Sequence, residues 1–301
     1  MEAQVDERER GSWSFEPRDT VVSGKHAIAC LGEGMRTESW LAWDAVRWAP
    51  VVVKILRPDH VASGKGLASL QREADAHRRL QHPAVQRMLE DGTDASPPYL
   101  VMEYVQGRTL CDVVDELGRL MLVDVVRLGL QVCSVLHYVH EEGLLHMDVK
   151  PGNVVMRAGQ AVVIDLGFVR PIGWAPSDGS PRGSWRYMAP EQCRGEPAGP
   201  STDLFGLGAM LYEIAAGEPA FRSTDGCFEQ LDRRAPPARL RAPELPSELD
   251  ELLQSLLEPE MAARPRTAAS VLSALDAVMP PDEAHVWPSF ARELLLTREA
   301  G

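Results

Sequence analysis

Cysteine and basic side chains are both scarce in this 301-residue sequence. The five cysteines stand far apart, without the paired spacing of a zinc site or a disulfide framework. This pattern suits reduced thiols in a cytoplasmic protein. Acidic side chains outnumber basic ones by 44 to 31, which gives a net charge of −13. Because an acidic surface repels phosphate backbones, nucleic-acid binding is not expected as the main activity.

Long apolar runs are scarce as well. We find none of the length needed to span a bilayer, and the opening MEAQVDERERGSW carries too much charge for a signal peptide. We therefore expect no membrane insertion and a cytoplasmic location. Apolar residues make up 45% of the chain and charged residues 25%, as in ordinary globular proteins. The length favours two packed units.

The apolar pattern changes along the chain. The first part has short β-branched and aromatic runs separated by Gly and Pro, which is typical of consecutive hairpins. The predicted strands are 26–31, 40–43, 51–56, 85–89 and 99–104, and the predicted helix is 67–80. The later part has helical periodicity. The predicted helices are 121–140, with Gly143 just past its end, 201–216, 249–257, and 267–278, with Thr267 as its N-cap.

Two motifs in the first part suit phosphate binding. Leu31-Gly32-Glu33-Gly34 lies between two predicted strands, where glycines let backbone N–H groups approach phosphate oxygens. Lys54 ends an apolar strand and is either an outward-facing residue or a buried charge that needs a partner. Glu73, on the following helix, is a candidate partner. Taken alone, the glycine motif favours a plain structural turn, whereas the pair Lys54 and Glu73 is equally compatible with a structural and a functional role.

The segment His146–Asn153 carries the most specific signal. It places Asp148, Lys150 and Asn153 at short fixed spacing in a loop after a helix. A carboxylate can accept the proton of a hydroxyl, a lysine can neutralise a γ-phosphate, and an amide oxygen can hold a metal. Asp165, in Ile164–Gly167 after a strand-like run, adds a carboxylate of the kind that Mg²⁺ prefers. Together these residues predict a phosphoryl-transfer site.

These motifs resemble the eukaryotic-type (Hanks-type) serine/threonine protein kinases, in the form common in bacteria. The resemblance extends over about residues 24–278. It implies a bilobal α+β kinase fold with an N-lobe of antiparallel sheet plus one helix and a mainly helical C-lobe. The expected segments are a flexible N-terminal lead-in at 1–20, the N-lobe at 21–105, the C-lobe at 106–279 and a C-terminal extension at 280–301.

The resemblance also implies an activity and a set of roles. The expected enzyme transfers the γ-phosphoryl group of ATP to Ser/Thr hydroxyls of protein substrates, including its own, with Mg²⁺ or in its place Mn²⁺. Lys54 matches the lysine that holds the α- and β-phosphates, Glu73 its helix partner, Asp148 the catalytic base and Lys150 a phosphate contact. The implied metal ligands are Asn153 and Asp165. The residues implied to bind the nucleotide are Leu31, Gly32, Glu33, Gly34, Ser39, Val52, Lys54, Met102, Glu103, Val105, Lys150, Asn153, Val155 and Asp165.

Three downstream residues match structural features of the same family. Glu191 closes the activation segment in Met188–Glu191, Arg264 matches its buried ion-pair partner, and Asp203 matches the aspartate that braces the catalytic loop. Small-molecule phosphotransferases generally lack this trio, so we disfavour that alternative. The other alternative is a pseudokinase or scaffold that binds nucleotide or partners without transfer. The intact set of catalytic residues argues against it.

The sequence departs from the family pattern at three positions. Thr37 replaces the third glycine of the loop, and Ser39 replaces the valine that covers adenine. Met147 replaces the arginine that normally pairs with a phosphate on the activation loop. We therefore hypothesise that phosphorylation of Ser177 or Ser180 has little influence on activity.

Overall fold

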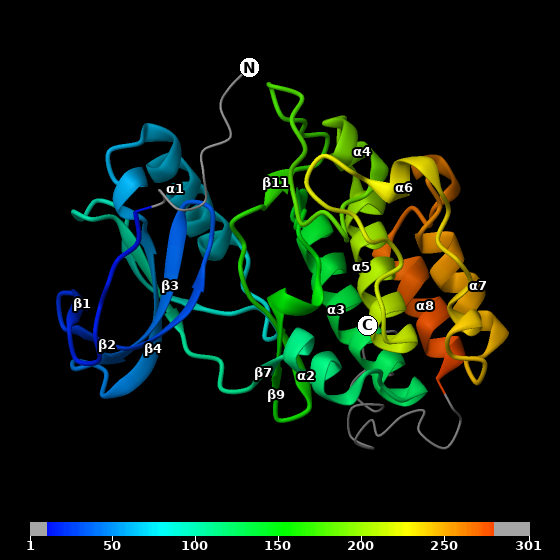
Figure 1. The fold of residues 1–301 in the computed structure, drawn as a ribbon, viewed down its shortest axis with the longest axis horizontal. Coiled ribbons are helices and arrows are strands. Elements are labelled where there is room, and N and C mark those ends of the chain that lie inside the picture. Colours follow the sequence, from blue (N-terminus) through cyan, green and yellow to red (C-terminus); the bar gives the residue numbers. More distant parts are fainter. Residues whose placement is uncertain (1–10, 280–301) are drawn as a thin grey trace, which may run out of the picture.

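The computed structural model describes residues 11–279 as an α+β protein of two lobes (Figure 1). The N-lobe, coloured blue to cyan, consists of an antiparallel sheet and one α-helix. The C-lobe, coloured green to orange, is mainly helical. This arrangement confirms the predicted fold class.

Six strands form the N-lobe sheet in the order β1-β2-β3-β4-β6-β5, and every neighbouring pair is antiparallel. The elements of this lobe are β1 (Thr20–Val22), β2 (Lys25–Glu33), β3 (Thr37–Asp44), β4 (Ala49–Leu56), α1 (Gly64–Arg79), β5 (Met88–Gly92) and β6 (Tyr99–Glu103). Lys54 pairs with Ser39 of β3, and Val52 pairs with Met102 of β6. Because directly paired residues share a face, and residues two apart share it too, these four side chains lie on the same face of the sheet.

Both faces of the N-lobe sheet are covered. One face packs against α1 through Leu56, Leu70 and Leu100. The opposite face, centred on Trp40, is covered by Trp13 and Phe15 from the segment before β1. The Phe15 ring lies edge-on to Trp40 at 5.2 Å between centroids and stacks on Trp13 at 5.5 Å. The expectation of a flexible lead-in up to residue 20 is therefore wrong over its described part, because these aromatic side chains complete an apolar core.

The hydrophobic core of the C-lobe lies between α3, α5, α7 and α8. The elements of this lobe are β7 (Arg108–Thr109), α2 (Leu110–Leu117), α3 (Leu122–Glu141), β8 (Leu144–Leu145), β9 (Val154–Arg157), β10 (Gln160–Val163), β11 (Arg170–Pro171), α4 (Pro190–Arg194), α5 (Pro200–Ala216), α6 (Glu229–Asp232), α7 (Ser247–Leu256) and α8 (Ala268–Val278). Single 3₁₀ turns occur at Pro58–His60, Pro151–Asn153, Ala238–Leu240 and Met261–Ala263.

By length and composition α3 is apolar enough to cross a membrane, contrary to our expectation that no segment would be. Its position in the fold accounts for this composition. The helix packs against α5, α8 and β10, and residues such as Val125, Val132 and Leu136 are buried. A helix with neighbours on several sides needs apolar residues around much of its circumference. We therefore read α3 as a core helix.

The predicted helices and most strands agree with the structure to within about three residues. Thr267 caps α8 by accepting the Ser270 N–H, and Gly143 follows α3 with φ +72°. The strand predicted at 85–89 begins only at Met88, because Val85 forms an isolated bridge with Val163 of the C-lobe. Helix α2 was not predicted. The C-terminal extension expected at 280–301 lies outside the described residues.

Candidate active site

A cleft of about 570 Å³ lies between the lobes. Its roof comes from β2, β3 and β4, and its floor from the loop before β9 and the residues after β10. The nucleotide-binding residues predicted from the sequence that line it are Leu31, Gly32, Glu33, Gly34, Ser39, Val52, Lys54, Met102, Val105, Lys150, Asn153, Val155 and Asp165. The structure therefore brings thirteen of the fourteen predicted residues to one cavity.

Lys54 joins the two lobes at the back of this cleft. Its Nζ lies 2.7 Å from Glu73 Oε1 on α1 and 2.8 Å from Asp165 Oδ1 after β10. Of the two alternatives for Lys54, the structure bears out the inward-facing charge, and Glu73 is its partner as expected. The contacts fix α1 against the sheet and hold the Asp165 carboxylate at the cleft.

The pKa shifts of Lys54, Glu73 and Asp165 indicate that Asp165 is ionised. Burial lowers the pKa of Lys54, but the carboxylates of Asp165 and Glu73 outweigh burial and raise that pKa above its usual value. Burial likewise raises the pKa of Asp165, but Lys54 and the Gly167 N–H outweigh it, and the net shift is well downward. Burial raises the pKa of Glu73 more than Lys54 lowers it. Asp165 therefore stays ionised where a cation would approach.

Asp203 on α5 anchors the loop His146–Asn153, which corresponds to the catalytic loop of the family, through hydrogen bonds to its backbone. The N–H groups of His146 and Met147 donate to the two oxygens of Asp203 at 2.8 and 2.7 Å. His140 Nε2 lies 2.9 Å from the same carboxylate. Burial raises the pKa of Asp203, but the His140 hydrogen bond and the backbone donors outweigh it and lower that pKa. A buried carboxylate that remains charged is a strong acceptor, so it fixes the loop backbone.

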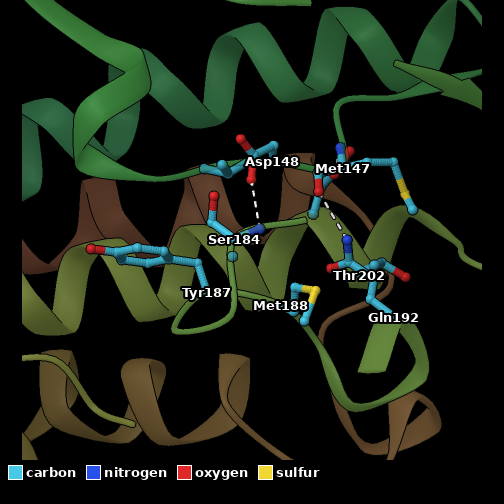
Figure 2. Close-up of a pocket in the computed structure, with 10 residues that line it drawn as sticks. Met147, Asp148, Ser184, Tyr187, Met188, Gln192 and Thr202 are labelled. Atoms are coloured by element: carbon cyan, nitrogen blue, oxygen red, sulfur yellow. Dashed lines mark hydrogen bonds between the residues drawn. The ribbon is translucent and has the colours of Figure 1, made fainter. Parts of the chain in front are cut away.

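Asp148 projects from this loop toward the activation segment (Figure 2). Its Oδ1 accepts the Ser184 N–H at 2.9 Å, and its Oδ2 lies 2.8 Å from Lys150 Nζ. The Lys150 ammonium also donates to Ser184 Oγ at 2.6 Å. Asn153 Nδ2 donates to the Asp148 carbonyl and to Oδ2 at 2.9 and 3.0 Å. Asp148, Lys150 and Asn153 thus form one connected group, as their spacing predicted.

The two predicted metal ligands suit a magnesium ion by their chemistry. Because the amide nitrogen of Asn153 is used on Asp148, its Oδ1 is left as the potential ligand. Asp165 supplies an ionised carboxylate and has φ +67°, a left-handed conformation that turns its side chain differently from that of a strand residue. Residues 11–279 contain no cluster of three or more His, Cys, Asp or Glu suited to a metal. Mg²⁺ commonly takes one or two protein oxygens and completes its shell with phosphates and water.

The activation segment ends at a buried ion pair. Arg264 binds Glu191 in a bidentate manner, with Nη1–Oε1 at 2.8 Å and Nη2–Oε2 at 2.9 Å. Thr202 on α5 donates its hydroxyl to Glu191 at 2.8 Å. The three downstream residues singled out in the sequence, Glu191, Arg264 and Asp203, therefore all meet partners inside the C-lobe.

Glu103 is the predicted nucleotide-binding residue that does not line the cleft. Its carboxylate turns to Arg87, 2.9 Å away, and its carbonyl accepts the Gln86 side-chain amide at 2.9 Å. The cleft includes several residues that sequence reasoning did not assign to the nucleotide. They are Thr37, Glu73, Gln86, Tyr104, Gly107, Thr109, Asp112, Gly152 and Ile164. Thr37 and Glu73 did have a signal, since the sequence places Thr37 in the glycine loop and makes Glu73 the candidate partner of Lys54.

The two lobes, the cleft and the Lys54–Glu73–Asp165 contact define a phosphotransferase with the architecture of a kinase. A family model described as the protein kinase domain matches residues 26–274, and the chain belongs to the protein kinase family.

Curated relatives carry serine/threonine kinase names. The chain is 32% identical over 285 residues to the serine/threonine-protein kinase PknB of Mycobacterium leprae, which covers 90% of this chain and 46% of that protein. It is 32% identical over 286 residues to PknB of Mycobacterium tuberculosis, with the same coverage. A probable serine/threonine-protein kinase of Clostridium perfringens is 30% identical over 257 residues, 83% of this chain and 38% of that protein. The chain therefore spans less than half the length of these relatives.

Proposed function

We propose that this chain transfers the γ-phosphoryl group of ATP to serine or threonine hydroxyls of protein substrates, its own included, with Mg²⁺ as the metal. The observation that carries this proposal is the Lys54 bridge from Glu73 to Asp165, with Asp148 and Lys150 on the other side of the same cleft. These are the positions needed to hold phosphates, a cation and an incoming hydroxyl together. The names of the relatives support the class of acceptor.

In this proposal each side chain has a physical task. Lys54 binds the α- and β-phosphates and stays cationic because two carboxylates flank it. Asp148 orients the acceptor hydroxyl and takes its proton, while Lys150 neutralises charge on the transferred group. Asn153 and Asp165 hold the metal ion, which supplies charge neutralisation on the phosphates when bound. Positioning and electrostatics account for most of the acceleration.

The test of the proposal is incubation with labelled ATP, Mg²⁺ and a generic acceptor such as casein. We expect label in the acceptor or in the chain itself, and its loss in Asp148→Asn, which keeps the size of the side chain but removes the base. Transfer to a metabolite but to no protein would point to a small-molecule phosphotransferase. Absence of any transfer would favour a scaffold that retains the fold.

The side chain of Met147 supports the proposal that loop phosphorylation matters little. It is buried with Leu145, Ala198 and Trp174 in an apolar cluster. A phosphate on the activation segment would find no cation at this position, and desolvating it there would be unfavourable. An alternative receiver is Arg170, whose pKa is lowered to about 10 by burial and by Arg72, Arg182 and Arg36.

We accordingly expect phosphatase-treated protein and a Ser177→Ala/Ser180→Ala variant to turn over within about threefold of each other and of the untreated protein. The measurement is initial rate with labelled ATP, with the phosphate content followed by mass spectrometry. A rate that rises more than about tenfold with a phosphate on Ser177 or Ser180 would contradict this expectation. It would instead point to an arginine such as Arg170 as the phosphate receiver.

A cytoplasmic location is also part of the proposal. All five cysteines are free thiols, and Cys133 and Cys193 are buried in the C-lobe. Free thiols are usual in a reducing compartment, and ATP is supplied there.

A further inference from the structure

Gln192 makes an unusual connection beneath the catalytic loop (Figure 2). It is the first residue after Glu191 and is only 5% exposed. Its Nε2 donates to the Met147 carbonyl at 2.8 Å and to the Arg182 carbonyl at 2.9 Å. Its Oε1 accepts the Ala189 N–H at 3.0 Å. One neutral amide therefore ties the catalytic loop to the activation segment and to the start of α4.

The backbone around this amide is shaped to meet it. Met147 has φ +70°, a left-handed conformation that is rare for a residue other than glycine. The Met147 N–H donates to Asp203 Oδ1, and the Met147 carbonyl accepts a hydrogen bond from Gln192 Nε2. Gly183 has φ +132°, and a Cβ there would lie 3.1 Å from Gln192 Nε2 and 3.2 Å from the Met147 carbonyl oxygen. Only glycine lets the segment pass this close.

The hydrogen bonds of Gln192 lie next to Asp148, the proposed catalytic base. Ser184, two residues after Arg182, donates its N–H to Asp148 Oδ1, and its hydroxyl accepts from Lys150 Nζ. Fixing the Arg182 carbonyl therefore fixes the register of Ser184 against Asp148. Residue 147, which precedes the base, is held by the same amide. Gln192 thus restrains Asp148 from both sides without touching it.

We propose that Gln192 is a positioning residue that locks the activation segment onto the catalytic loop through neutral hydrogen bonds, so that Asp148 is set for proton transfer without a phosphate on the segment. This inference rests on the proposed kinase function. It deepens that function by naming what takes the place of a phosphate contact. The apolar side chain of Met147 offers no charge to a phosphate, and the Gln192 amide links the catalytic loop to the activation segment instead.

The test compares phosphatase-treated native protein with Gln192→Leu and Gln192→Glu. In Gln192→Leu the carbonyls of Met147 and Arg182 lose their donor, and we expect kcat to fall by about tenfold or more. The KM for ATP should stay within about twofold, since Gln192 does not line the nucleotide cleft. The control is Gln131→Leu. This removes another C-lobe amide, which accepts the Ala161 N–H, and should lower stability but not kcat.

Gln192→Glu provides the readout that a general folding defect would not give. An ionised carboxylate would face two carbonyl oxygens, whereas its protonated form is isosteric with the native amide and can donate to one of them. We expect the kcat of the variant divided by that of the native protein to rise at least about threefold from pH 8.5 to pH 6.5. The neighbouring charged groups Asp148, Lys150, Glu191 and Asp203 are common to both proteins, so the ratio reports the effect of residue 192.

Three results would overturn the inference: a Gln192→Leu kcat within threefold of native, a pH-independent ratio for Gln192→Glu, or recovery of Gln192→Leu upon phosphorylation of the segment. Each is distinct from failure of the kinase function itself. That failure would appear in the native protein, as transfer no greater than in Asp148→Asn.

Discussion

Replacing Asp165 by asparagine is expected to lower phosphoryl transfer by at least about a hundredfold. The change removes the carboxylate charge that we propose holds Mg²⁺, and it leaves Lys54 with Glu73 as its only acidic partner. The rate is measured with labelled ATP across a series of Mg²⁺ concentrations. We expect the loss to persist at high Mg²⁺, because an amide is a weaker ligand than a carboxylate for this hard cation.

The choice of substitution matters at this position. Asp165 has φ +67°, where alanine is strained and asparagine is tolerated. Asp165→Ala should also abolish transfer, but its melting temperature should be lower than that of Asp165→Asn. The matched control is Asp75→Asn, an equal charge change on the exposed side of α1. Transfer near the native rate in Asp165→Asn, with Asp75→Asn also active, would contradict the metal assignment.

Replacing Arg264 by methionine is expected to destabilise the C-lobe by about 3–5 kcal/mol. The guanidinium has no exposed surface, binds Glu191 with both outer nitrogens and lies 4.9 Å from the Phe205 ring. It also donates to the carbonyls of Glu258 and Pro259. Without it the Glu191 charge is left buried with the Thr202 hydroxyl as its remaining side-chain donor. Urea unfolding measures the change.

The exposed pair Arg222–Glu218 is the control for this experiment. Its arginine is 70% exposed, and such pairs contribute only about 0–1 kcal/mol. Arg222→Met should therefore leave the unfolding midpoint nearly unchanged. A double variant, Arg264→Met/Glu191→Leu, should be less destabilised than the sum of its single changes, because it leaves neither charge unpaired. Equal effects of Arg264→Met and Arg222→Met would show that the buried pair contributes little.

The proposed catalytic residues could be predicted because their chemistry restricts residue type at short spacing. Asp148, Lys150 and Asn153 lie within six positions, and the structure joins all three through hydrogen bonds. Asp165 follows an apolar strand, as its role near the cleft requires. The strand that carries Val52 and Lys54 was predicted as well, and its alternation places both side chains on one face of the sheet.

Contacts between distant positions carried no local signal. Gln192 meets Met147 across 45 positions, and Trp13 meets Glu38 across 25. Gln86 reaches the hinge carbonyl of Glu103, but nothing in the surrounding residues distinguishes it from any polar loop residue. Such roles depend on which segments the fold brings together, and a single sequence does not contain that information in its spacing.

Helix α2, in contrast, has a start signal in the sequence. Thr109 and Asp112 form a reciprocal capping box, in which each side chain accepts the backbone N–H of the other. Thr-x-x-Asp before the apolar residues of this helix is a sequence-level start signal. The strand predicted at 85–89 was misplaced for another reason. Val85 is apolar because it packs against the C-lobe, not because it belongs to the N-lobe sheet.

The aromatic residues Trp13 and Phe15, before β1, determine where a recombinant kinase domain should begin. Glu38 is completely buried, and its carboxylate receives the Trp13 N–H and the Trp40 indole N–H. The Trp13 indole in turn caps the carbonyl of Leu56 at the end of β4. A recombinant fragment trimmed to the family match at residue 26 would remove one donor from the buried carboxyl group of Glu38 and uncover Trp40. The folded N-lobe therefore includes Trp13 and Phe15.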